Sequence, residues 1–181
     1  MTGSGLRRLI HAATVLLLVV PIVASWDLFR GILIAGTMIG LVLETVRIKV
    51  QTVQAPLARF SPLFRSGEVN RLSGAWWLCL GYCVAAWVPQ PGAAAGILVG
   101  ALADPAASLV GSARGRPSPK TAHGSGAAFA VAMLALAPMG LPWTAVIGGA
   151  LVGTALERWS GPIDDNLLIA PGVASAVWLL A

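Results

Sequence analysis

Long apolar runs separated by short polar clusters make up this chain. The apolar stretches cover residues 9–25, 28–46, 72–88, 92–110, 124–140, 142–156 and 166–181. Several approach the length of about 20 residues that crosses a bilayer as a helix, and some are shorter. The pattern predicts an all-α, polytopic membrane protein with about seven transmembrane helices, in which residues 1–181 form a single integral membrane domain. Arg7 and Arg8 before the first run resemble a signal peptide, but no small-residue cleavage pattern follows, so this run is predicted to be a helix.

Composition and charge placement support the membrane assignment and suggest an orientation. The chain is 57% hydrophobic and 10% charged, which leaves too little polar surface for a soluble globule. If the N-terminus is cytoplasmic, eleven of the 12 Lys and Arg residues fall on the cytoplasmic side, and Arg30 is the exception. We therefore expect an N-in protein of the plasma (inner) membrane of a prokaryote, with a cytoplasmic active site. Basic cytoplasmic loops explain the net charge of +5, so no nucleic-acid partner is expected.

The acidic residues indicate where chemistry is concentrated. Six of the seven lie in polar clusters between apolar runs, namely Glu44, Glu68, Asp104, Glu157, Asp164 and Asp165. A carboxylate near the bilayer centre costs about 2.5–3.5 kcal/mol on insertion scales, so it needs a compensating role. This distribution favours a membrane enzyme that acts on a charged substrate.

One predicted helix carries a carboxylate on a face of small residues. At helical spacing a ligand or another helix can approach the backbone closely on this face, which contains Gly100, Asp104, Ala107, Ser108 and Gly111. A packing face made of small residues is the simpler interpretation. That interpretation does not explain Asp104.

The loop after this helix is suited to polyphosphate. Arg114, Gly115, Arg116 and Lys120 precede Thr121, Ala122, His123, Gly124 and Ser125. Backbone N–H groups at the next helix start and the three cations would bind phosphate. Lys120-Thr121 lacks the preceding Gly of a Walker loop, and no strand comes before it. Phosphate binding and a plain cytoplasmic loop both remain open on spacing alone.

Three acids and an amide form the final cytoplasmic cluster. Glu157, Asp164, Asp165 and Asn166 precede the last run, and closely spaced carboxylates favour a divalent cation such as Mg²⁺. One of the two Asp residues is alternatively the N-cap of the last helix. Glu44 with Arg47, and Glu68 with Arg71, are spaced as local ion pairs on helix ends.

Taken in order, these segments resemble the CTP-dependent lipid-alcohol kinases, the family of dolichol kinase, phytol kinase and fungal-type diacylglycerol kinase. Arg8-Leu-Ile-His11 is similar to the family's R-K-x-x-H, with Leu9 in place of Lys, and Glu44-Thr-Val-Arg47 resembles E-x-x-R. Glu68 with Ser73-Gly74-Ala75 resembles E…S-G-A, and Asp104 to Gly111 with Gly115-Arg116 resembles D-x-x-A-x-x-x-G…G-[RK]. Lys120-Thr-Ala-His123-Gly124-Ser125 is similar to K-[ST]-x-E-G-S, and Asp164-Asp165-Asn166-Leu167 to D-D-N-[LF]. Six such elements in register cover nearly the whole chain.

The resemblance implies phosphoryl transfer from CTP, with Mg²⁺, to the hydroxyl of a lipid alcohol such as a polyprenol, phytol or diacylglycerol. Arg114, Arg116 and Lys120 would hold the triphosphate, and Asp104 would orient or deprotonate the hydroxyl. The implied catalytic residues are Asp104, Lys120 and Asp165, and the implied metal ligands are Asp104, Asp164 and Asp165. The implied nucleotide-binding residues are Ser108, Gly111, Arg114, Gly115, Arg116, Lys120, Thr121, Gly124, Ser125 and Asn166. Further candidates are Arg8, His11, Glu44, Arg47, Glu68, His123 and Glu157, and His123 stands where the family has Glu.

Two other functions compete with the kinase. Phosphatidate cytidylyltransferases also use CTP and Mg²⁺, and their K-x-W-x-G loop resembles the segment from Ser118 to Gly124, but their P-G-H-G-G…D-R element is absent here. A small transporter would carry its ionisable groups near the middle of the membrane. The gathering of acids on one side favours an interfacial enzyme.

Overall fold

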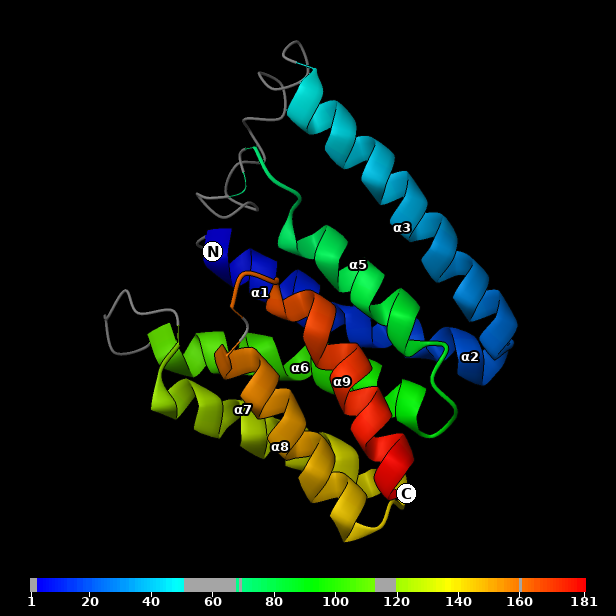
Figure 1. The fold of residues 1–181 in the computed structure, drawn as a ribbon, viewed down its shortest axis with the longest axis vertical. Helices are drawn as coiled ribbons and strands as arrows, with labels where there is room; N and C mark the ends of the chain where they lie inside the picture. The colour runs from blue at the N-terminus through cyan, green and yellow to red at the C-terminus, as the bar shows by residue number, and fades with distance from the viewer. Residues whose placement is uncertain (1–2, 51–67, 69, 113–119, 160) are drawn as a thin grey trace.

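Every regular element that the structure describes is helical. The computed structural model describes residues 3–50, 68, 70–112, 120–159 and 161–181. The helices are α1 (Gly3–Ala13), η1 (Thr14–Leu18), α2 (Val19–Val23), α3 (Trp26–Lys49), α5 (Gly74–Ala85), α6 (Gly92–Ser112), α7 (Ala122–Leu136), η4 (Ala137–Met139), α8 (Trp143–Trp159) and α9 (Asp165–Leu180) (Figure 1). The predicted all-α class is confirmed for this part of the chain, and helices occupy each of the predicted apolar stretches.

Among the described residues, four helical segments are long and apolar enough to cross a membrane. They cover Gly5–Val23, Trp26–Lys49, Gly92–Ser112 and Ala122–Met139. Helices α5 and α9 are apolar but shorter. Segments of this length and composition are typical of an integral membrane protein.

Side-chain caps fix where several helices begin. Ser25 accepts a hydrogen bond from the Leu28 amide at 3.1 Å at the start of α3, and Thr121 accepts one from the Gly124 amide at 3.0 Å at the start of α7. Asp164 caps α9 by accepting from the Asn166 amide at 3.1 Å. These bonds satisfy N–H groups that have no partner inside the helix. The capping interpretation of the Asp pair is therefore confirmed for Asp164.

The first apolar stretch is not a single α-helix, although the sequence predicts one. The 3₁₀ segment η1 separates α1 from α2. Thr14 Oγ1 donates a hydrogen bond to the His11 carbonyl oxygen at 2.6 Å, and Pro21 has no backbone N–H to donate. Both effects weaken the α-helical hydrogen-bond ladder between α1 and α2.

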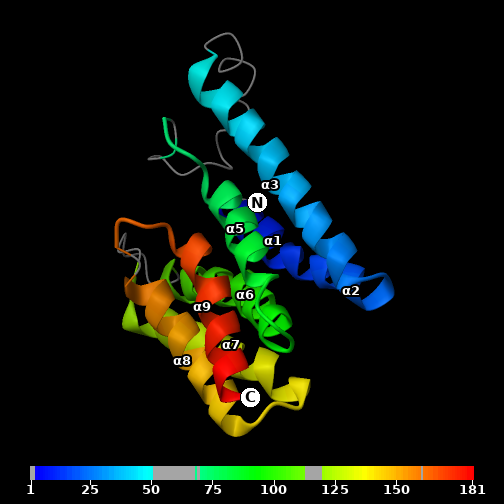
Figure 2. The same cartoon turned by 45° about the vertical axis from the view of Figure 1, so that its right-hand side comes forward.

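Helix α6 lies at the centre of the bundle and packs most extensively on α7 and α9 (Figures 1 and 2). Glycine allows the close approach of α6 to α9. A Cβ atom built at Gly96 would overlap the Ala170 carbonyl oxygen, and one at Gly100 would lie 3.1 Å from the Ala170 Cβ. Small residues at this contact let the two backbones meet, as in many membrane helix pairs.

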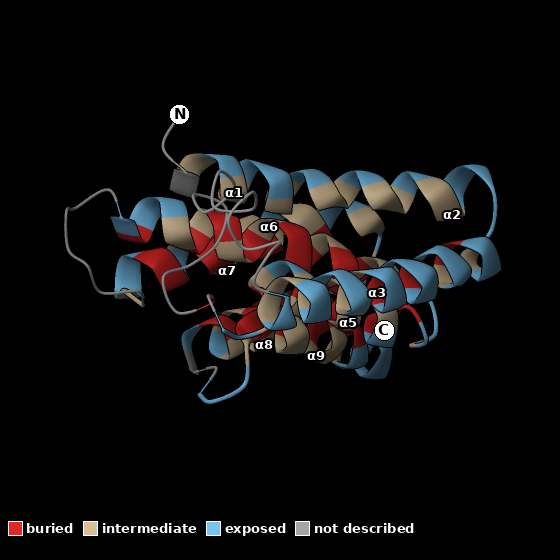
Figure 3. Cartoon of the chain, turned by 90° about the horizontal axis from the view of Figure 1, so that it is seen from above, coloured by how far each residue is buried: buried red, intermediate tan, exposed pale blue. Residues whose placement is uncertain are grey.

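Helix α3 lies at the edge of the bundle and packs on α5 and α2 (Figure 2). Buried residues gather on α6 to α9, whereas α3 is mostly exposed (Figure 3). On α3 the apolar side chains of Ile39 and Leu43 are 61% and 64% exposed. Apolar exposure on this scale suits a surface that contacts lipid rather than water.

Candidate functional site

A cavity of about 440 Å³ lies where α1, α3, α5, α6 and α9 meet. Its polar lining comes from helices far apart in the sequence, namely Arg7, Arg8, His11, Thr14, Glu44, Glu68, Ser73, Asp104, Ser108 and Asn166. Its apolar lining includes Ile10, Ala75, Leu78 and Cys79. The cavity is therefore amphiphilic, and it adjoins most of the acidic clusters that the sequence singles out.

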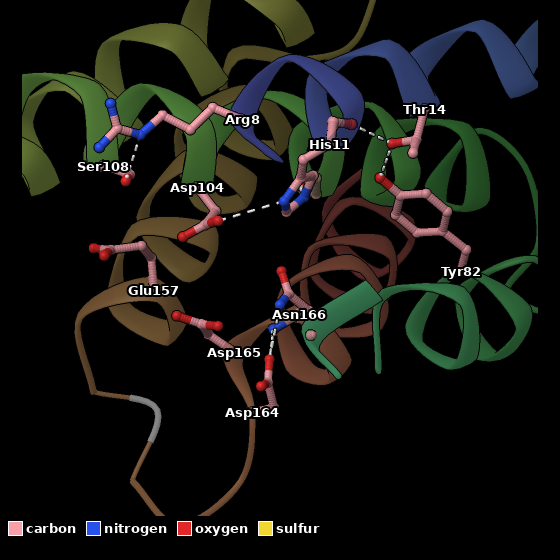
Figure 4. Close-up of polar contacts among 12 residues, drawn as sticks. Arg8, His11, Thr14, Tyr82, Asp104, Ser108, Glu157, Asp164, Asp165 and Asn166 are labelled. Carbon is pink, nitrogen blue, oxygen red and sulfur yellow. Dashed lines mark hydrogen bonds and ion pairs between the residues drawn. The ribbon is translucent and has the colours of Figure 1, made fainter. Parts of the chain in front are cut away.

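The α1–α6 wall joins two of the sequence motifs. Arg8 Nε donates to Ser108 Oγ at 2.9 Å, and His11 Nδ1 lies 3.5 Å from Asp104 Oδ2 (Figure 4). The other His11 nitrogen lies 3.1 Å from the Gly100 carbonyl oxygen. Gly100, Asp104 and Ser108 therefore share one face of α6, as their spacing predicts, and α1 covers that face. Asp104 is 15% exposed, so its carboxylate is shielded but reachable.

The α3–α5 wall is held by a network around Glu44 and Arg47. The predicted local pair is present, with Arg47 Nη2 at 2.6 Å from Glu44 Oε2. Arg47 also donates to the carbonyls of Glu68 and Arg71, and Glu44 accepts from Ser73 Oγ at 2.7 Å. The Glu68 carboxylate accepts from the Gly74 amide at 3.1 Å at the start of α5. These bonds fasten the end of α3 to the beginning of α5.

Next to the cavity, Lys120 lies between two buried carboxylates. Its Nζ is 2.7 Å from Asp165 Oδ2 and 3.4 Å from Glu157 Oε1, and it also donates to the Glu157 carbonyl. Burial lowers the pKa of Lys120, but the hydrogen bond and charge of Asp165, together with the charge of Glu157, outweigh this effect and raise the pKa. The sequence motifs place Lys120 on phosphate; in this structure its ammonium group holds α8 and α9 together.

Glu157 is more central than the sequence indicates. Burial raises its pKa, Lys120 opposes the rise, and the charges of Asp104 and Asp165 add to it. Asp104, Glu157 and Asp165 are thus within electrostatic reach of one another, and Figure 4 shows them facing a common space. In the described part of the chain, no group of three His, Cys, Asp or Glu side chains is arranged as a ready metal site.

The predicted metal ligand Asp164 lies at the edge of this group. Its Oδ1 accepts from both the backbone amide and the side-chain Nδ2 of Asn166, the latter at 2.8 Å. The Asn166 side chain is 4% exposed, and its Oδ1 has no hydrogen-bond partner among the described residues. Asn166 thus brings a buried acceptor to the cavity.

Several predicted nucleotide-binding residues have structural contacts instead of cavity positions. A Cβ atom at Gly111 would lie 3.1 Å from Thr121 Oγ1, and one at Gly124 would lie 2.8 Å from the Ala107 carbonyl oxygen. Ser125 Oγ donates to Glu157 Oε2 at 3.4 Å and accepts from Arg158 at 3.3 Å. These residues let α7 pack closely on α6 and α8.

The remaining predicted residues near the start of α7 lie away from the cavity or outside the described residues. His123 is exposed on the first turn of α7, and the predicted phosphate residues Arg114, Gly115 and Arg116 lie outside the described residues. Sequence reasoning missed the hydrogen bond of 2.8 Å between Thr14 and Tyr82 that joins η1 to α5. No local pattern could have revealed it, because the two residues lie in different apolar runs.

The sequence matches no protein-family model, and comparison with curated proteins and with solved structures gives no match either.

Proposed function

We propose that this protein is a CTP-dependent kinase that phosphorylates the hydroxyl group of a membrane lipid alcohol. One observation carries the proposal: segments that resemble the family's motifs, although far apart in the sequence, meet around one amphiphilic cavity. Arg8, His11, Glu44, Glu68, Asp104, Ser108 and Asn166 all line it, and Lys120 with Asp165 lies beside it. Independent packing requirements would not be expected to bring these particular residues to one place.

The geometry suits phosphoryl transfer to an amphiphile. The apolar lining, with Leu78 and Cys79, would receive the start of a lipid chain, and the polar lining would receive its hydroxyl. In the reaction the hydroxyl oxygen attacks the γ-phosphorus, the bond to the β,γ-bridging oxygen breaks, and CDP leaves. Asp104 takes the hydroxyl proton, since its carboxylate lines the cavity.

Lys120 is the described cation of the motif that resembles K-[ST]-x-E-G-S, and it would meet the triphosphate. Its side chain is 28% exposed, and its ammonium group contacts Asp165. A triphosphate would compete with the two carboxylates for this charge. Arg114 and Arg116, which precede Lys120 in the sequence, would add further positive charge for the triphosphate.

The oxygen-rich cluster fits Mg²⁺. Asp104 and Asp165, with Glu157 near both, offer hard carboxylate ligands, and Mg²⁺ commonly binds through one or two carboxylates together with substrate phosphates. Asp164 is the weaker candidate, because its Oδ1 caps α9. The bound ion would supply neutralisation of the phosphate charge.

The membrane arrangement belongs to the same proposal. We propose seven spans with the N-terminus in the cytoplasm, because this arrangement places eleven of the 12 Lys and Arg residues inside. It also places the acidic clusters at the cytoplasmic interface of a prokaryotic plasma membrane, where CTP is available. Cysteine accessibility in intact cells tests it: Gly140→Cys should be labelled from outside and His123→Cys from inside.

The direct test uses purified protein in nanodiscs with Mg²⁺, γ-labelled CTP and a panel of polyprenol, phytol, diacylglycerol and phosphatidate. Label on a lipid alcohol supports the kinase. A CDP-lipid with release of pyrophosphate would instead identify a cytidylyltransferase, and the absence of both products would refute the proposal. Asp104→Asn should lower the rate by about a hundredfold or more, whereas Ser175→Ala on the exposed face of α9 should not.

A further inference from the structure

The Asn166 side chain presents a fixed hydrogen-bond acceptor to the cavity. Its Nδ2 donates to Asp164 Oδ1 at 2.8 Å, and a flipped amide would place two oxygens against each other. The backbone at Gly74 restrains the same amide, since a Cβ atom there would lie 2.9 Å from Nδ2. The amide oxygen therefore faces away from Asp164, on the side of His11 and Asp104 (Figure 4).

This oxygen is an acceptor that a donor group of a ligand can satisfy. Asn166 is one of the residues that line the cavity, and its buried Oδ1 accepts no hydrogen bond from any described residue. A buried acceptor without a partner is costly, so a ligand that supplies an O–H or N–H group gains affinity. An anion gains no hydrogen bond from this oxygen, because Asn166 offers only an acceptor there.

The rest of the cavity lining indicates which kind of ligand would supply the O–H or N–H donor. Ile10, Ala75, Leu78 and Cys79 form apolar lining next to Asn166 and Asp104. A lipid chain that ends in a hydroxyl matches both parts of the lining. A nucleotide base also offers N–H groups. Of the described nucleotide-binding candidates, Ser108 and Asn166 line this cavity, whereas Lys120, Thr121, Gly124 and Ser125 do not.

We propose that Asn166 is a positioning residue for the acceptor lipid: its Oδ1 accepts the hydrogen bond of the lipid hydroxyl before transfer. This inference rests on the proposed function and deepens it. A hydroxyl has a single proton, which points to Asn166 in the waiting complex and turns to Asp104 as the oxygen attacks phosphorus. A neutral amide cannot take the proton, so Asn166 contributes to lipid binding and Asp104 to the transfer step.

Two matched ligands test, in the absence of nucleotide, whether Asn166 contributes to lipid binding. We would measure binding of phytol and of phytyl methyl ether to the solubilised full-length protein by native mass spectrometry. The ether keeps the oxygen and the chain but lacks the donor. Wild-type protein should bind phytol about five to a hundred times more tightly, and equal binding of the two lipids by wild-type protein would overturn the inference without any variant.

Variants separate the donor effect from the size of the methyl group. Asn166→Leu has a similar volume and no acceptor, so it should bind the alcohol and the ether equally. Asp104→Asn should keep the preference for the alcohol while losing transfer, and Ser175→Ala serves as the control on the same helix. A preference that persists in Asn166→Leu would overturn the inference.

The outcomes also distinguish this inference from the kinase proposal. If phytol is preferred through Asn166 but no lipid is phosphorylated, the kinase proposal fails and the binding role stands. If phosphorylation occurs and Asn166→Leu alters only the preference for CTP over UTP, the residue belongs to the nucleotide site and the inference is overturned.

Discussion

Replacing Lys120 with methionine removes the ammonium group that lies between two buried carboxylates. Glu157 is 3% exposed and Asp165 is 6% exposed, and Lys120 Nζ lies 2.7 Å from the Asp165 carboxylate. Methionine retains most of the aliphatic volume. The variant therefore tests the charge of Lys120 more than its packing.

The expected loss follows from the burial of the two acids. Removing one partner of a buried ion pair costs about 3–5 kcal/mol, because the other charge remains in a medium of low dielectric. Lys120 itself is 28% exposed, so water already screens part of the interaction. We therefore expect Lys120→Met to lower the free energy of unfolding by about 2–3 kcal/mol at neutral pH.

The loss should depend on pH in a defined direction. Burial raises the pKa of Glu157 and Lys120 opposes the rise, so removal of Lys120 raises this pKa further. Protonation relieves the repulsion between the two acids, and the cost of the variant should shrink towards pH of about 5.

The assay is SDS titration of the purified protein in mixed micelles, followed by tryptophan fluorescence. Lys49→Met is the matched control, since Lys49 is exposed at the end of α3, and it should change stability by less than about 0.5 kcal/mol. Equal losses in the two variants, or a Lys120→Met loss that is the same at neutral and acidic pH, would refute the electrostatic reasoning.

Three further perturbations test other parts of the structure. In wild-type protein the pKa of Glu157 is raised, so the folded state holds the carboxyl proton more tightly than the unfolded state does. Glu157 therefore contributes to stability below its ordinary pKa of 4.5, and this contribution is lost as pH rises through the folded pKa. Glu157→Gln should remove this decline when SDS titrations are repeated across pH. Gly96→Ala should destabilise the protein by about 1–3 kcal/mol, because its Cβ would overlap a carbonyl oxygen of α9, whereas Gly36→Ala, with no atom within 4 Å of the added Cβ, should be neutral or stabilising in the same titration. Tyr82→Phe should cost about 0.5–1.5 kcal/mol through loss of its hydrogen bond to Thr14, and a double-mutant cycle with Thr14→Val that shows no coupling would contradict this.

The helices could be predicted from the sequence because they depend on local composition. Apolar runs bounded by Pro, Gly and capping residues fall where the structure has helices, and Asp164 is the cap that the last run requires. The common face of Gly100, Asp104 and Ser108 also follows from helical spacing alone. The break within the first run was missed, since Thr14 and Pro21 act through particular backbone hydrogen bonds.

The candidate site was only partly predictable. The sequence identified the residues of the Asp104, Lys120 and Asp165 clusters as chemically unusual, because charged groups are costly beside apolar spans. It could not pair them. The pairing depends on which helices become neighbours. In the structure Lys120 contacts Glu157 as well as Asp165, and Glu44 accepts a hydrogen bond from Ser73.

Local sequence therefore predicts the all-α class, the positions of the described helices and the residues whose burial needs an explanation. These properties depend on hydrophobicity and on local hydrogen bonding, which neighbouring residues decide. The packing of the helices, in contrast, brings Asn166 into the lining of the cavity that Asp104 also lines, and it places Lys120 between two carboxylates. Both arrangements depend on distances between helices far apart in the chain, and close packing at small residues such as Gly96 sets those distances.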